Sequence, residues 1–65
     1  MFGQRIKELR QERGLTQIQL AELLFTTQST IGKYEREELQ PNIEVLKRLC
    51  KVFEVSSDYI LGLND

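Results

Sequence analysis

Four polar side chains in one short segment have the chemistry of a surface that reads DNA bases. The segment LFTTQSTIGKYER runs from position 24 to 36, and at 100° per residue its Gln28, Ser29, Lys33 and Arg36 fall on one side of a helix. Glutamine can form a bidentate pair with adenine, serine can donate or accept, and lysine can reach guanine. We therefore predict base contacts by Gln28, Ser29 and Lys33. Arg36 is placed for a phosphate, a contact that positions a protein without reading sequence.

A solvated helix face is the alternative interpretation of the same residues, because most polar helix faces bind nothing. Gly32 favours a binding surface, since glycine inside a helix costs about 1 kcal/mol relative to alanine and its missing side chain leaves room for a close approach. The net charge of the chain, in contrast, argues against a nucleic-acid partner. Nine Lys and Arg against ten Asp and Glu give a net charge of -1, whereas nucleic-acid-binding domains usually have a basic excess.

Helical spacing of apolar residues dominates the chain, and no stretch alternates as a strand would. A length of 65 residues allows one domain, which we place at 1–65. Thr16 with Gln19 forms a capping box, Thr27 is a further N-cap, and Gly14 ends the first helix. The fold is therefore predicted to be all-α and compact, with helices at about 2–13, 17–24, 28–36, 43–54 and 57–61.

The second and third predicted helices are joined by only three residues, so they must cross steeply as a helix-turn-helix over 17–36. The apolar faces of the helices are expected to form one core. Its expected members are Phe2, Ile6, Leu9, Leu20, Ala21, Leu23, Leu24, Ile31, Tyr34, Ile43, Leu46, Leu49, Cys50, Phe53, Tyr59, Ile60 and Leu61.

Several classes of protein are disfavoured by what the sequence contains. Cys50 is the single cysteine, which excludes an internal disulfide and a cysteine-based zinc site and suits the reducing cytoplasm. The longest apolar run is three residues, too short for a membrane span. With no histidine and no inward cluster of carboxylates, we expect neither an enzyme nor a metal or other cofactor.

The segments RIKELRQERGLTQIQLAELL, TTQSTIGKYER and QPNIEVLKRLCKVFEVSSDYILG resemble successive parts of the Cro/CI-type phage-repressor helix-turn-helix family. The resemblance spans Arg5 to Gly62. It implies a five-helix, lambda-repressor-like bundle. It also implies that the protein is a transcriptional regulator that binds specific sequences of double-stranded DNA, and a repressor is the expected kind of regulator. It also implies a homodimer on a near-palindromic operator, with dimer contacts around Val55 to Tyr59.

Residue roles follow from the same resemblance. Gln17 would contact a phosphate and brace Gln28, and Thr27 would contact a phosphate at the start of the reading helix. Arg10 would form an ion pair with Glu35, locking the first helix against the third, and would also reach a phosphate.

Departures from the family pattern lie in the turn, where Thr26 also replaces a common apolar residue, and after the reading helix. Phe25 stands where the family usually has a glycine, and a left-handed conformation there would cost a non-glycine residue about 1 kcal/mol. Glu37 and Glu38 follow the reading helix, where the family often has glycine and basic residues. The acidic balance keeps a second interpretation open: a helix-turn-helix protein-interaction module such as an antitoxin or an anti-repressor partner.

Overall fold

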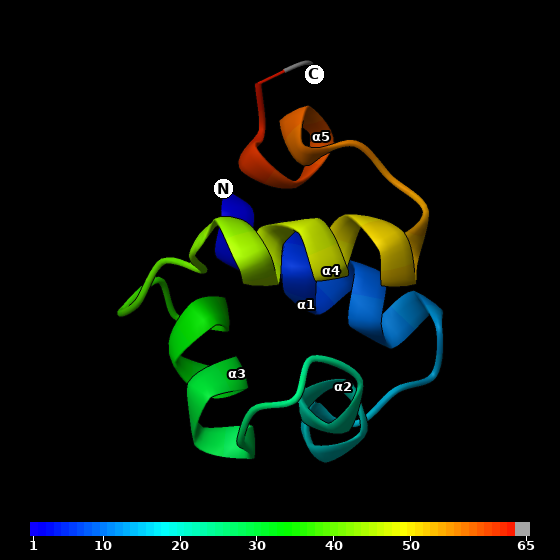
Figure 1. The fold of residues 1–65 in the computed structure, drawn as a ribbon, viewed down its shortest axis with the longest axis vertical. Helices are drawn as coiled ribbons and strands as arrows, with labels where there is room; N and C mark the ends of the chain where they lie inside the picture. Colours follow the sequence, from blue (N-terminus) through cyan, green and yellow to red (C-terminus); the bar gives the residue numbers. More distant parts are fainter. Residues whose placement is uncertain (64–65) are drawn as a thin grey trace.

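Five α-helices make up the computed structural model, which describes residues 1–63 (Figure 1). They are α1 (Phe2–Glu12), α2 (Gln17–Leu23), α3 (Gln28–Glu35), α4 (Ile43–Phe53) and α5 (Ser57–Leu61). The predicted all-α five-helix fold is confirmed. Each helix starts where predicted, and α1 to α4 end one residue earlier, because the last predicted residue of each is its C-cap, which is only half in the helix. Positions 64–65 of the predicted domain lie outside the described residues.

The helix starts follow from their capping residues. Thr16 and Gln19 form the predicted capping box, in which each side chain bonds the other's backbone N–H. The side chains of Thr27, Asn42 and Ser56 each accept a hydrogen bond from the backbone N–H three residues on. Such a cap contributes about 1 kcal/mol, so these short helices begin at defined positions.

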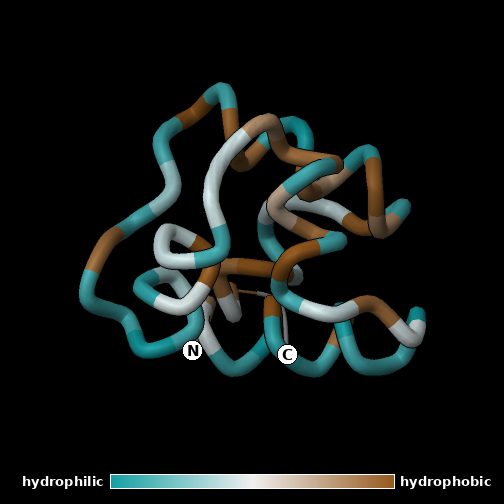
Figure 2. Tube along the Cα trace, turned by 90° about the horizontal axis from the view of Figure 1, so that it is seen from below, coloured by the Kyte–Doolittle hydropathy of each residue, from teal (hydrophilic) through white to brown (hydrophobic). Residues whose placement is uncertain are grey.

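The helices surround a single core. In Figure 1, α4 crosses in front of α1, α5 lies at the end of the molecule near the N-terminus, and α2 and α3 lie at the opposite end. Figure 2 shows hydrophobic and hydrophilic stretches alternating along the trace, as expected when each helix turns one side inward. The largest fully buried side chains are Ile6, Leu20, Leu24, Ile31, Leu49, Phe53 and Ile60.

The predicted core position is wrong for four residues, of which Ile43 (72% exposed) and Leu23 (47% exposed) are the most exposed. Ile43 is the first residue of α4, and its side chain lies at the surface. Leu23 ends α2 and faces α4 across a hollow instead of packing against it. Tyr59 and Leu61 on α5 are also more exposed than predicted, because five residues make little more than one turn and bury mainly Ile60.

The start of α1 lies directly against the end of α3. A Cβ atom at Gly3 would meet the carbonyl oxygens of Glu35 at 2.5 Å and Tyr34 at 2.7 Å, so only glycine allows this approach. The backbone N–H of Gly3 donates to Glu37 Oε2 at 3.1 Å. The last turn of α3 is therefore held in place by α1, which fixes how α3 projects from the bundle.

The turn between α2 and α3 contains the strained residue that the sequence suggested. Phe25 has a φ of 58°, in the left-handed region, and costs about 1 kcal/mol relative to a residue without a Cβ. Its side chain is 82% exposed, so burial of the ring in this chain does not offset the strain.

Candidate nucleic-acid interface

Helix α3 has one face in the core and one face in solvent. Ile31 and Tyr34 are buried, and burial raises the pKa of the Tyr34 hydroxyl. Gln28, Ser29 and Lys33 are all exposed on the other face. The three side chains predicted to contact bases thus share a surface that no other element of the described chain covers.

An ion pair between α1 and α3 lies directly behind this surface. Nε of Arg10 lies 2.6 Å from Oε2 of Glu35, and Nη2 lies 3.3 Å from Oε1. The side chains are only 11% and 5% exposed. The Nη1 atom of Arg10 also donates to the carbonyl oxygen of Leu15 at 2.9 Å. Because three of its five N–H groups donate within the protein, only the remaining two can reach a phosphate.

The ion pair continues outward through two glutamines to the exposed face. Nε2 of Gln17 donates to Glu35 Oε1 at 3.0 Å, and Nε2 of Gln28 donates to Gln17 Oε1 at 3.4 Å. Arg10, Glu35, Gln17 and Gln28 therefore form one hydrogen-bonded chain from a buried guanidinium to a predicted base-reading amide. Such a chain restricts the orientation of the Gln28 amide, as a reader of base edges requires.

The N-termini of α2 and α3 add positive potential beside this face. Their first turns contain only uncharged residues, whereas α4 and α5 carry Glu44 and Asp58 in theirs. Backbone N–H groups and the helix dipole make a first turn without acidic side chains attractive to phosphate. Gln17 and Thr27 stand at these two N-termini, which suits their predicted phosphate contacts.

Arg36 is placed differently from the prediction of an open phosphate ligand. Its Nε lies 2.9 Å from Oε2 of Glu38 and its Nη2 lies 3.2 Å from Oε1. The hydrogen bonds and charge of Arg36 hold the pKa of Glu38 below its usual value, so Glu38 is anionic at neutral pH. The Nη1 atom of Arg36 also lies 2.9 Å from where a Cβ of Gly32 would stand. The room left by Gly32 is therefore filled by Arg36.

Two contacts could not be read from the sequence. The bond from Gln17 to Glu35 joins residues 18 positions apart, and only the packing of α2 against α3 brings them together. The pair of Arg36 and Glu38 spans two positions, a spacing at which side chains of a regular helix do not meet. It forms because α3 ends at Glu35 and the backbone turns at Glu37, whose φ is 61°.

The described residues also bear on metal binding, membrane insertion and thiol chemistry. Within residues 1–63, no three His, Cys, Asp or Glu side chains lie together as metal ligands would. Over the same residues, each helix is too short or too polar to cross a lipid bilayer. Burial raises the pKa of the Cys50 thiol, so it is a poor nucleophile at neutral pH.

Comparisons with known proteins agree with this geometry. A family model described as helix-turn-helix matches residues 6–60. The uncharacterised HTH-type transcriptional regulator YobD of Bacillus subtilis (strain 168) is 43% identical over 65 residues, which are all of this chain and 58% of YobD. The chain spans only 50–58% of the first three curated relatives that it matches.

Two solved structures with DNA are similar over almost the whole chain. A crystal structure of the P22 c2 repressor with a synthetic operator matches with a TM-score of 0.92 and 31% identity, over 98% of this chain and 97% of that one. A crystal structure of SinR, a master regulator for biofilm formation, in complex with DNA matches with a TM-score of 0.83 and 35% identity, over 94% and 98% of the two chains.

Proposed function

The chain belongs to the Cro/CI-type helix-turn-helix family, and from this premise we propose that it is a sequence-specific double-stranded DNA-binding regulator of transcription. The family is not an enzymatic one. The single observation that carries the proposal is the chain of hydrogen bonds from Arg10 through Glu35 and Gln17 to Gln28. A helix face that is only solvated gains nothing from hydrogen bonds that fix the orientation of one of its side chains.

In this proposal, α3 enters the major groove and its exposed side chains contact bases. Gln28 pairs with an adenine, and Ser29 and Lys33 contact neighbouring bases. Gln17, Thr27 and Arg36 contact phosphates on either side. Arg10 supports Glu35 from below, and its two remaining N–H groups are the ones available for a phosphate.

We propose repression by a homodimer on a near-palindromic operator in the cytoplasm, where two α3 helices one turn of DNA apart read the half-sites. Dimer contacts around Val55 to Tyr59 stay a prediction. The exposure of Tyr59 supports it, although its ring already lies under the Arg5 guanidinium at 4.3 Å. The interaction-module alternative is less well supported, because YobD is named as a transcriptional regulator and the P22 c2 repressor and SinR were both solved with DNA.

A salt titration with selected DNA tests the proposal. Duplexes are selected from a random pool with this chain, and the dissociation constant is measured by fluorescence anisotropy at several salt concentrations. We expect log K to fall linearly with log salt, by roughly 0.9 for each phosphate that a Lys or Arg neutralises. Failure to enrich any sequence, with no binding at low salt, would leave the interaction module as the better description.

Glu38 is expected to weaken DNA binding, because its carboxylate occupies the hydrogen-bond donors of Arg36 that a phosphate would otherwise bind. We expect Glu38→Gln to tighten binding severalfold at low salt, for selected and unrelated duplexes alike. The salt slope should also steepen, by at most roughly 0.9 per subunit, because Arg36 then neutralises a phosphate instead of a carboxylate.

Glu12→Gln is the matched control for this variant. It makes the same change in net charge at an exposed position at the far end of α1. An equal gain from both variants would show that only overall charge matters and that Glu38 does not mask Arg36.

A further inference from the structure

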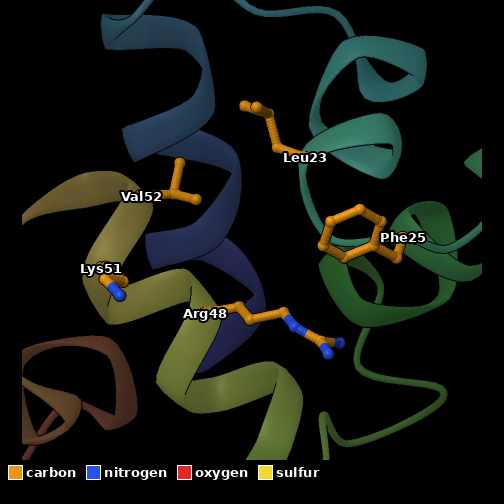
Figure 3. Close-up of a pocket in the computed structure, with 5 residues that line it drawn as sticks. All are labelled: Leu23, Phe25, Arg48, Lys51 and Val52. Carbon is orange, nitrogen blue, oxygen red and sulfur yellow. The ribbon is translucent and has the colours of Figure 1, made fainter.

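A second surface lies between the end of α2 and α4, apart from the reading face. It is a hollow of about 340 Å³, lined by Leu23, Phe25, Arg48, Lys51 and Val52. Figure 3 shows Leu23 and Phe25 on one side of it, with Val52, Lys51 and Arg48 on α4 on the other. None of these residues has a role in the proposed DNA contacts.

The apolar part of this surface is exposed to solvent. Phe25 and Leu23 both face solvent, and the guanidinium of Arg48 lies over the ring of Phe25, 5.2 Å from its centroid. The phenylalanine occupies a left-handed position that suits glycine. A strained backbone that presents an uncovered aromatic ring points to a function for the ring.

The polar part of the surface is cationic. Arg48 is only loosely paired, with Nη2 3.8 Å from Oε2 of Glu44, and Lys51 is exposed one turn along α4. Aromatic residues and arginine are enriched in protein–protein interfaces, and Phe25 and Arg48 supply one of each beside the hollow. An occupant must place an apolar side chain in the hollow and carboxylates beside Arg48 and Lys51.

We propose that this surface binds an acidic segment of a partner protein, in which an aliphatic or aromatic side chain is flanked by Asp or Glu. The apolar side chain fills the hollow between Leu23 and Val52 and packs on the ring of Phe25. The carboxylates pair with Arg48 and Lys51. Because none of these five residues is among the proposed DNA contacts, the proposal does not depend on the DNA-binding function.

A random 12-residue peptide library displayed on phage, selected on the 65-residue chain, tests the proposal. We expect enriched peptides to combine a large apolar residue with two or more acidic residues. Their affinity, measured by fluorescence anisotropy, should fall at least tenfold for Phe25→Gly and for the double variant Arg48→Glu with Lys51→Glu. A double variant Lys7→Glu with Lys47→Glu makes the same charge change at exposed positions outside the hollow and should bind as the native chain does.

Phe25→Gly also separates this surface from the fold and from DNA binding. Glycine suits the left-handed position, so the variant should keep its melting temperature and its affinity for selected duplexes. Enrichment of basic or uncharged peptides, or of none that distinguish the native chain from Phe25→Gly, would overturn the proposal. So would self-association in analytical ultracentrifugation that Phe25→Gly abolishes, because the occupant would then be a second copy of the chain.

Discussion

Arg10→Met is expected to remove a large part of the free energy of unfolding of the chain. Removing one partner of a buried ion pair leaves an uncompensated charge and typically costs about 3–5 kcal/mol. Domains have only about 0.05–0.15 kcal/mol of stability per residue, so a 65-residue chain loses most of its margin. Glu35, at 5% exposure, is the charge left unpaired. Thermal unfolding followed by circular dichroism measures the loss as a fall in melting temperature, at about 4–8 °C per kcal/mol.

Arg36→Met is the matched control, since it removes an arginine from a pair of similar length with Glu38 that lies in solvent. Its melting temperature should barely change, because exposed pairs contribute little. An unchanged melting temperature for Arg10→Met as well would show that the buried pair does not hold α1 to α3.

The double variant Arg10→Met with Glu35→Met distinguishes stability from function. Replacing both members of a buried pair by apolar residues is often neutral or stabilising by about 1–4 kcal/mol, so this variant should fold. It removes the acceptor of Gln17, however, and should lose preference among selected duplexes. A double variant that folds and reads DNA as before would remove the hydrogen-bonded chain from the mechanism.

Gln28→Ala is expected to weaken binding to the preferred duplex by about 1–3 kcal/mol, the usual discrimination from one bidentate contact with a base. The loss should concentrate at one position of each half-site, where all four bases become nearly equivalent. Competition binding with duplexes that carry each base at that position measures it. The physical reason is that Gln28 is both exposed and held by Gln17.

Gln11→Ala provides the control, because it removes the same amide from an exposed position on α1. It should leave affinity and selectivity unchanged. Uniform weakening of all duplexes by Gln28→Ala would contradict base reading and would indicate a backbone contact instead.

The fold was largely predictable because the start of most helices is set by a capping side chain close by in the sequence. Thr16, Thr27, Asn42 and Ser56 act on backbone groups within three residues, so their effect does not depend on tertiary structure. The periodic apolar residues then give the core. The errors lie where burial depends on a neighbour: Ile43 is apolar and in register but lies at the surface of the bundle, and Leu23 faces a hollow.

The exposed polar face of α3 was predictable from the sequence, whereas the full set of hydrogen bonds behind it was not. The pattern of polar residues marks Gln28, Ser29 and Lys33, whereas the link from Gln17 to Glu35 needs two helices in place. The surface around Phe25 was missed for a related reason. The sequence signal was present, as a large side chain in a tight turn, but Arg48 and Lys51 join it only when α4 packs beside α2.

The support of Gln28 lies apart from the side chains that we propose to read bases. Arg10, Glu35 and Gln17 are hydrogen-bonded to one another behind α3, while the side chains at positions 28, 29 and 33 are exposed to solvent. A combinatorial library that randomises those three positions should therefore yield folded members at high frequency. New target preferences can then be selected from one scaffold without redesign of its interior.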